Sequence, residues 1–359
     1  MKIALVTETF PPEINGVART LERTVTGLVE RGHDLSVIRP KQGKADAPKH
    51  EYYREYLMPG CPVPRYPGLR FGWPAYFKLK KLWRSMPPER VHVATEGPLG
   101  VSSIFAANAL NIPIYSSFHT NFHTYGEHYG YGFLIQTVYA YLKWVHNRTS
   151  ATLAPAREVV DSLQQAGFKR VHLWERGVDT NWLSPEKRDA ELRESWGAGE
   201  NTPVVLYVGR VASEKNMPLV FRAVRKMQKV NPELKLVVVG DGPEKTKFER
   251  EYPDFIFAGP RTGEDLARHY ASGDFFLFGS LTETFGNVIT EAMGSGLLVL
   301  TYDYAAGNKH IRHGENGFLA PYNHEDALIE QAVALLSEPV SKRDSMRKQA
   351  REDALGMSW

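Results

Sequence analysis

Two glutamates eight positions apart, Glu283 and Glu291, flank the segment of this chain that is best suited to chemistry. An apolar run, Phe275 to Phe278, leads toward Glu283, and the apolar spacing from Val288 to Met293 predicts a helix that carries Glu291. Gly286 lies where that helix would begin. Free N–H groups at a helix N-terminus are a natural binding site for a phosphate or diphosphate. Carboxylates at the two edges of such a site could hold sugar hydroxyls. Eight helical positions span roughly 12 Å, which is about the reach from one sugar across a diphosphate to another.

Two cations follow a strand predicted at Val204 to Val208. Arg210 and Lys215 lie in the loop after that strand, where they would neutralise the negative charge that grows on a diphosphate leaving group. A solvated loop with one arginine and one lysine is also common on protein surfaces. We favour the ligand-binding interpretation because the same half of the chain offers a helix N-terminus after Glu283.

Two further candidates follow predicted strands in the first half of the chain. Gly16 precedes a helix predicted at residues 17–31, and a glycine there lets a ligand approach the backbone closely, although an ordinary turn would also use a small residue. His119 follows a strand predicted at residues 112–117. Its imidazole could donate a hydrogen bond to a sugar hydroxyl or phosphate, or transfer a proton. A lone histidine is more often structural, but its place at a strand end favours a functional role.

The elements that would position these residues are short apolar runs that alternate with amphipathic helical patterns. This alternation predicts parallel α/β units. A length of 359 residues exceeds one typical core and indicates two domains, which we place at residues 1–180 and 181–359 with a linker within residues 174–187. Each half is expected to be Rossmann-like and doubly wound, with ligands at the carboxyl ends of the strands in the cleft between the halves. Further strands are predicted at residues 2–7, 35–38, 91–94, 234–239, 255–258 and 297–301, and a tight turn at Gly240 to Pro243.

Composition excludes several classes of protein. The net charge of +3, from 44 basic and 41 acidic residues, is too small to indicate nucleic-acid binding. The single cysteine, Cys61, excludes an intrachain disulfide and a cysteine metal cluster. No apolar run approaches the ~20 residues of a membrane span, and the start of the chain is too short and poorly flanked for a signal peptide, so we expect a cytosolic protein. Residues 78–84 and 131–148 combine aromatic and basic side chains; either segment could lie on an anionic membrane surface or pack as an ordinary amphipathic helix.

Taken together, these motifs resemble the retaining glycosyltransferases of family four, which have the GT-B fold of two Rossmann-like domains facing a central cleft. The resemblance covers nearly the whole chain, and its elements occur in the order found in the family. The branches that this chain resembles most are bacterial enzymes that glycosylate lipids, the mannosyltransferase-like and sulfoquinovosyltransferase-like members. The motifs are Asn15 to Val17, Ser117 to Thr120, Val145 to Arg148, Leu173 to Thr180, Val208 to Arg210 with Glu214 and Lys215, and the pair Glu283 and Glu291.

The resemblance implies a role for each candidate residue. Arg210 and Lys215 would bind the diphosphate and stabilise the departing nucleotide. Glu283 would hold hydroxyls of the donor sugar, and Glu291 would bind the ribose. His119 would lie beside the reactive face of the sugar. Other donor contacts would come from Gly16 and from Phe285, Gly286, Asn287 and Val288 near the phosphates, and from Gly259 and Arg261 near the base.

The implied reaction moves a hexose from GDP-mannose or a UDP-hexose with retained configuration and with no required metal or other cofactor. No carboxylate stands out as a covalent nucleophile, so we expect attack on the same face, assisted by the leaving phosphate. The implied acceptor is a lipid or lipid-linked glycan, and the enzyme would be cytoplasmic and peripheral on the inner face of the cell membrane. Two alternatives stay open: a soluble acceptor, and a non-catalytic nucleotide-sugar-binding protein.

Two departures from the family pattern concern the second half of the chain. Family members usually continue past a Ser-Trp pair with a helix that crosses back to the first domain, whereas this sequence stops at Ser358-Trp359, so we expect that helix to be short or missing. In addition, Gly307 to His310 replaces the small and acidic residues expected after Tyr304 to Ala306.

Overall fold

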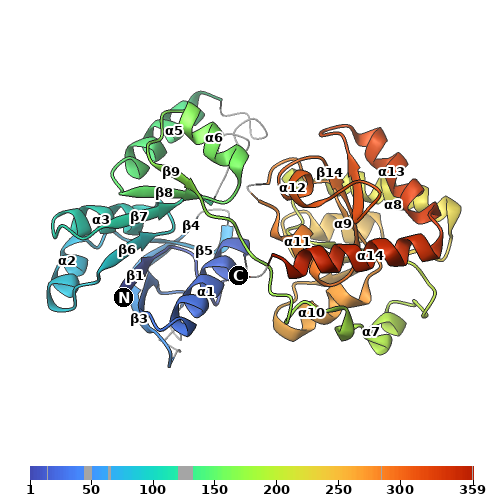
Figure 1. Cartoon of the computed structure of the whole chain (residues 1–359), viewed down its shortest axis with the longest axis horizontal. Helices are drawn as coiled ribbons and strands as arrows, with labels where there is room; N and C mark the ends of the chain where they lie inside the picture. The colour runs from blue at the N-terminus through green and yellow to red at the C-terminus, as the bar shows by residue number, and fades with distance from the viewer. Residues whose placement is uncertain (14, 44–50, 64–65, 120–131, 284, 358) are drawn as a thin grey trace. The chain divides into compact units, whose positions relative to one another are not determined.

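A computed structural model describes the chain except for residues 14, 44–50, 64–65, 120–131, 284 and 358. The chain divides into two compact units, Met1–Glu175 and Arg176–Trp359. The division lies inside the predicted linker at residues 174–187, a few residues before the predicted domain limit at residue 180. The first unit runs from blue to green in Figure 1 and the second from green to red.

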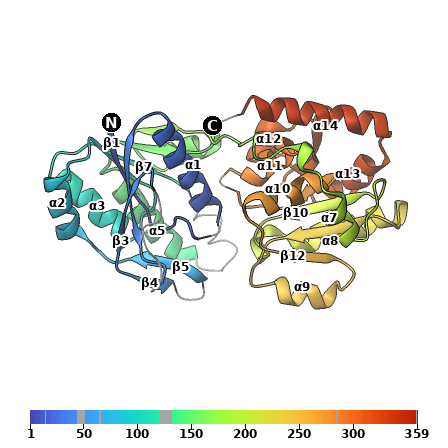
Figure 2. The same ribbon diagram turned by 90° about the horizontal axis from the view of Figure 1, so that it is seen from below.

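The first unit is built on a seven-stranded sheet in which neighbouring strands are parallel, in the order β3-β2-β1-β6-β7-β8-β9 (Figures 1 and 2). Its strands are β1 Lys2–Val6, β2 Asp34–Pro40, β3 Arg54–Met58, β6 Arg90–Val93, β7 Ile114–Ser117, β8 Ala151–Ala154 and β9 Val171–Leu173. An antiparallel pair, β4 Gly60–Val63 and β5 Tyr66–Gly72, forms a separate small sheet. The helices are α1 Gly16–Glu30, α2 Tyr76–Ser85, α3 Pro98–Asn108, α5 Gly132–His146 and α6 Arg157–Gln165.

Local sequence explains where α1 begins and ends. The Asn15 side chain accepts a hydrogen bond from the Ala18 N–H at 2.8 Å, which satisfies one of the free donors of the first turn. Gly32 has a φ of +79°, and this left-handed conformation just past the helix end favours glycine. The predicted helix and the strand before it are therefore confirmed to within one residue at each end.

The second unit is built on a six-stranded parallel sheet in the order β12-β11-β10-β13-β14-β15. Its strands are β10 Val204–Val208, β11 Lys235–Val239, β12 Ile256–Gly259, β13 Phe275–Phe278, β14 Leu298–Tyr302 and β15 Gly317–Ala320. The α-helices are α7 Ala190–Ser195, α8 Met217–Val230, α9 Lys245–Glu251, α10 Gly263–Ser272, α11 Asn287–Gly294, α12 Ala306–His310, α13 Glu325–Ser337 and α14 Val340–Leu355, and 3₁₀ turns cover Pro185–Lys187 and Ser213–Lys215. In both sheets the strand order reverses beside the first strand, as the doubly wound prediction requires.

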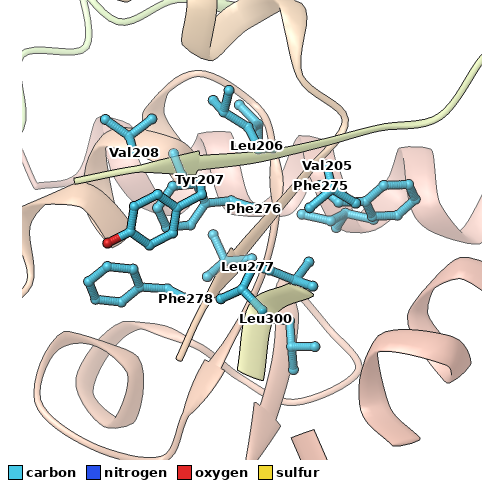
Figure 3. Packing of buried hydrophobic residues seen from close by; sticks show 14 of the residues in the cluster. Val205, Leu206, Tyr207, Val208, Phe275, Phe276, Leu277, Phe278 and Leu300 are labelled. Atoms are coloured by element: carbon cyan, nitrogen blue, oxygen red, sulfur yellow. The ribbon is translucent and has the colours of Figure 1, made fainter. Parts of the chain in front are cut away.

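The core of the second unit fixes the strand ends that carry the candidate residues. Every residue of β10, β13 and β14 is buried, because a parallel sheet covered by helices has no solvent-exposed face. Figure 3 shows the aromatic side chains of β13 packed against β10, and the rings of Tyr207 and Phe278 stack with centroids 6.0 Å apart. The loops after β10 and β13 therefore begin at strand ends that the packed core holds in place.

The last described helix, α14, packs against α11 inside the second unit. Arg351 of α14 donates to the carbonyl oxygens of Leu183 at 2.6 Å and Thr180 at 2.8 Å, and also to the Gly294 carbonyl at the end of α11. Residue 358 lies outside the described part of the chain, and the prediction about a crossover helix concerns residues after α14 and stays a prediction. Within the described residues, no helix is long and apolar enough to cross a bilayer.

Candidate active site

The candidate residues of the second unit lie at the carboxyl ends of its strands. Lys215 ends the 3₁₀ turn after β10, and Glu283 lies in the loop after β13, 68 positions later in the sequence. The Lys215 Nζ donates a hydrogen bond to Glu283 Oε1, and both side chains are 15% exposed. An ion pair this shielded from water is stronger than a surface pair, but its two charges remain within reach of a ligand.

The loop that carries Glu283 ends at the N-terminus of α11, as the sequence predicts. Gly286 forms the N-cap of the helix and has a φ of +95°. Residues other than glycine adopt this left-handed backbone conformation only under strain. Asn287 and Val288 are the first two residues of α11, so their N–H groups belong to the set that has no partner within the helix. Thr284 lies outside the described residues. The N-terminus of α11 thus lies directly after the loop that carries Glu283, and helix N-termini are suited to anions in general.

Glu291 lies on α11, one turn further along the helix. The Tyr270 phenol of α10 donates a hydrogen bond to Glu291 Oε2 at 2.8 Å. This phenol was not among the predicted site residues, because it is 21 positions away in the sequence and follows no strand. It holds the Glu291 carboxylate at a fixed place beside the start of α11.

Arg210 follows β10 with an exposed side chain, and its Nη1 lies 3.5 Å from Glu214 Oε1. The Tyr207 phenol donates to the Arg210 carbonyl oxygen at 2.9 Å, which ties this loop to the strand. Burial raises the pKa of Tyr207 well above its usual 10.0, and the negative charges of Glu283 and Glu214 add to that effect. The phenol therefore stays protonated and remains a hydrogen-bond donor at neutral pH.

A second arginine, Arg176, reaches the same region without having been predicted as a site residue. Its Nη1 donates to Asn287 Oδ1 at 3.4 Å. Partial burial lowers the pKa of Arg176 to about 10, and the nearby Glu283 carboxylate opposes that shift, so the guanidinium remains cationic at neutral pH. Its position in the Leu173 to Thr180 motif was the only signal in the sequence.

Gly259 and Arg261 lie at the end of β12. The Arg261 guanidinium donates to the Ala258 carbonyl oxygen at 2.7 Å and to Asp265 at 3.1 Å, so it folds back over its own strand end. The Lys245 N–H donates to the Gly242 carbonyl oxygen at 3.2 Å, which closes the predicted turn after β11. The structure brings these residues to the same edge of the sheet as Lys215 and Glu283.

Gly16 and His119 belong to the first unit. Gly16 is exposed at the first position of α1, and a Cβ built there would have no atom within 4 Å, so its backbone is open to approach. His119 is buried directly after β7, where the Phe118 N–H donates to the Leu153 carbonyl oxygen at 2.8 Å. The predicted neighbours of His119, residues 120–123, lie outside the described part of the chain. Gly16 begins the helix that follows β1, and His119 lies two residues after the end of β7, so both follow strands at the carboxyl edge of the first sheet.

The first unit also contains a buried carboxyl that the sequence did not single out. Glu8 follows β1, and its Oε1 accepts a hydrogen bond from the Leu99 N–H at the start of α3 at 2.9 Å. Burial raises the pKa of Glu8 to about 7, although the helix N–H groups favour the charged form. A Cβ at Gly97 would lie 1.7 Å from Glu8 Oε2, so only glycine leaves room for this carboxyl.

Metal-ligating side chains are not clustered in the described part of the chain: no group of three or more His, Cys, Asp or Glu residues there could hold an ion. Cys61 is exposed on β4.

Comparisons with known proteins agree with this arrangement. Residues 14–182 match the model of Glycosyltransferase Family 4, and residues 188–353 match that of Glycosyl transferases group 1. A GDP-mannose-dependent alpha-mannosyltransferase of Mycobacterium tuberculosis is 32% identical over all of this chain and 93% of its own length. An alpha-monoglucosyldiacylglycerol synthase of Streptococcus pneumoniae is 26% identical over 93% of this chain and 79% of its own length.

Solved structures share the architecture. Anabaena Alr3699/HepE, in complex with UDP and glucose, superposes with a TM-score of 0.76 at 19% identity, covering all of this chain and 95% of that one. Together with the two parallel-sheet Rossmann-like units of this chain, this likeness confirms the GT-B fold that the resemblance implied.

Proposed function

The chain belongs to glycosyltransferase family four and is a glycosyltransferase, and from that premise we propose that it moves a hexose from GDP-mannose to a lipid or lipid-linked acceptor with retention of configuration. The Lys215–Glu283 pair carries this proposal, because it joins a cation suited to a diphosphate to a carboxylate suited to sugar hydroxyls. A non-catalytic binding protein, the second alternative raised by the sequence, does not agree with the family.

In this proposal the donor lies along the carboxyl edge of the second sheet. The first-turn N–H groups of α11 and the charges of Arg210 and Lys215 receive the diphosphate. Glu283 accepts hydrogen bonds from the sugar hydroxyls, and Glu291, held by Tyr270, accepts them from the ribose. Gly259 and Arg261 lie toward the base at the end of β12.

The chemical step that we propose is substitution at the anomeric carbon on the face from which the nucleotide departs. The bond from this carbon to the diphosphate oxygen breaks as the acceptor hydroxyl oxygen attacks, and the leaving phosphate takes the hydroxyl proton. Lys215 and Arg210 stabilise the charge that grows on the diphosphate, which is why no metal ion is part of the proposal. His119 and Gly16 are assigned to the sugar and to the diphosphate on the basis of the family resemblance alone.

The choice of GDP-mannose over a UDP-hexose rests on the likeness to the GDP-mannose-dependent mycobacterial relative, whereas the Anabaena structure holds UDP. The test is a transfer assay with radiolabelled GDP-mannose or UDP-glucose and liposomes of bacterial lipids, followed by NMR of the anomeric configuration of the product. We expect an α-linked mannolipid and free GDP. Transfer only to soluble acceptors, an inverted product or a trapped glycosyl-enzyme adduct would contradict the proposal.

A surface of the first unit supports a lipid acceptor. Helix α2 carries no acidic residue, and Lys78, Lys81 and Arg84 on it are exposed. Phe77 is 84% exposed, and Trp73, just before the helix, is 59% exposed. Basic and aromatic side chains together are typical of a surface that binds anionic lipids, and we propose that α2 lies on the inner face of the cell membrane.

The described part of α5 adds exposed aromatic residues to the α2 surface. Tyr141 and Trp144 are exposed, and the Arg148 guanidinium lies 4.0 Å from the centroid of the Trp144 ring. Phe105 of α3, also exposed, lies 5.8 Å from Trp144 between ring centroids. Residue 131, the start of the predicted segment, lies outside the described residues. Leu142 and Val145 of α5 are buried, so that face packs on the core, and we propose that the exposed aromatic face meets the lipid.

Sedimentation with vesicles of anionic phospholipid tests the membrane proposal. Replacing Lys78, Lys81 and Arg84 with glutamine should weaken binding by about 3 kcal/mol, at roughly 1 kcal/mol for each basic residue near the surface. A matched control replaces the exposed Lys226, Lys229 and Lys247 of the second unit with glutamine and changes the net charge equally. Equal losses in the two triple variants would mean that total charge, rather than α2, governs binding.

A further inference from the structure

The loop between β13 and α11 is held by two phenols from outside it. The Tyr304 hydroxyl donates to the carbonyl oxygen of Glu283 at 3.0 Å. The Tyr322 hydroxyl donates to the carbonyl oxygen of Leu281 at 2.9 Å. Both hydrogen bonds therefore end on backbone atoms of the loop that carries the Glu283 carboxylate.

The two phenols support one another. Tyr304 follows β14 and Tyr322 follows β15, and their ring centroids are 4.9 Å apart. From the same segment as Tyr304, the Ala306 N–H donates to the Phe285 carbonyl oxygen at 2.9 Å. Segments after two neighbouring strands thus contact the loop at residues 281, 283 and 285.

We propose that Tyr304 and Tyr322 are positioning residues that set where the Glu283 carboxylate lies. The side chain of Glu283 is bound to Lys215 at one end, and its backbone is bound to Tyr304 at the other. Hydrogen bonds to the loop backbone restrict where the Glu283 carboxylate can lie, and a carboxylate displaced by about 1 Å from a reacting sugar loses much of its effect on rate. This inference rests on the proposed role of Glu283 toward the donor sugar.

The chain offers a matched control in the same aromatic cluster. Tyr302 ends β14, and its ring lies 6.1 Å from that of Tyr322. Its hydroxyl is buried and makes no hydrogen bond to the residues that the structure describes. Tyr302→Phe therefore removes a hydroxyl from this cluster without removing a contact to the Glu283 loop.

The experiment compares Tyr304→Phe, Tyr322→Phe, the double variant and Tyr302→Phe for kcat, KM for the sugar donor and the Kd of GDP. We expect kcat to fall about 2- to 10-fold for Tyr304→Phe, the effect of one neutral hydrogen bond, and further for the double variant, with the Kd of GDP unchanged. Tyr302→Phe should match the wild type. Hydrogen exchange of the amides of residues 281–286 should quicken in Tyr304→Phe and Tyr322→Phe only.

Several results would overturn the inference: Tyr304→Phe and Tyr322→Phe that behave like Tyr302→Phe, or a loss of GDP affinity as large as the loss of kcat. If Tyr304→Phe does not fold, Tyr322→Phe and its amide exchange decide the question in the same way. Glu283→Gln separates this inference from the proposed function. A fully active Glu283→Gln enzyme removes the role of Glu283 itself, whereas an inactive one beside unaffected phenol variants removes only the positioning role.

Discussion

Lys215 donates a hydrogen bond to Glu283, so a cation from the loop after β10 meets a carboxylate from the loop after β13 at one edge of the second sheet. Neither loop could form this contact alone, because the two residues are 68 positions apart. The sheet brings them together by placing β10 and β13 side by side. The pair is the structural basis for assigning diphosphate and sugar to neighbouring positions.

Replacing Lys215 with alanine should lower kcat by about 100-fold or more, because its charge meets charge that develops in the transition state. The Kd of GDP should change much less. Steady-state kinetics and calorimetry measure the two quantities, and Lys226→Ala, an exposed lysine of α8, is the control. Equal losses in kcat and in GDP affinity would contradict the role in transition-state stabilisation.

Replacing Glu291 with glutamine should raise the Kd of the nucleotide by about 10- to 100-fold, the effect of losing a charged hydrogen bond worth about 1.5–3 kcal/mol. Tyr270→Phe should weaken binding less, because it removes only the phenol that orients the carboxylate. Calorimetric titration of both variants and of the double variant gives the coupling between the two residues. Unchanged affinity in Glu291→Gln would remove the ribose assignment.

Gly16→Ala should reduce turnover and leave the melting temperature unchanged. A Cβ at this position meets no atom of the protein within 4 Å, so the fold accommodates it. A ligand phosphate lying against the backbone would not, because the methyl group occupies the same space. Melting curves and kcat/KM check the two halves of this expectation, and full activity in Gly16→Ala would mean that no ligand lies against this backbone.

Stability should fall with rising pH because of Glu8. Its carboxyl titrates near 4.5 when free and near 7 in the folded chain, so between these values the folded chain binds more protons than the unfolded chain. The free energy of unfolding therefore decreases through that range, by roughly 3 kcal/mol if this group acts alone. Glu8→Gln removes this contribution. The melting temperature of the variant, relative to that of the wild type, should therefore increase as the pH rises from 5 to 8.

The control for that experiment is Glu30→Gln, which changes an exposed carboxylate at the end of α1. Its melting temperature should follow that of the wild type at each pH. A difference between wild type and Glu8→Gln that stays constant from pH 5 to pH 8 would show that the carboxyl titrates alike in the folded and unfolded chains.

The sequence predicted the strands and helices whose apolar residues form a clear run or a clear helical spacing. The apolar runs of β1, β10 and β13 and the amphipathic spacing of α1, α8 and α11 appear at the predicted places. Strands β8, β9 and β15 were not predicted, because they are short and include small or polar residues, as in the Ala-Thr-Leu-Ala sequence of β8, and so lack the bulky apolar run that marks β13. The antiparallel pair β4 and β5 was missed for the same reason and because Pro62 and Pro67 interrupt it.

The candidate site divides in a similar way. Glu283, Gly286 and Lys215 were predicted as site residues because each follows a strand or begins a helix within a short stretch of sequence. Tyr270, Tyr304 and Arg176 were not, because their importance comes from contacts to residues 21 or more positions away. Glu8 looks like an exposed loop residue in sequence, and only α3, 91 positions later, buries it. Contacts of this kind depend on tertiary structure, which spacing along the chain does not encode.

We propose that the second unit binds the nucleotide part of the donor between Lys215 and Glu291. The most direct test is calorimetric titration of wild type and Glu291→Gln with GDP, UDP and ADP. We predict that GDP binds most tightly to the wild type and that Glu291→Gln binds it about 10- to 100-fold more weakly. Absence of binding for all three nucleotides, or equal GDP affinity in the two proteins, would contradict the account.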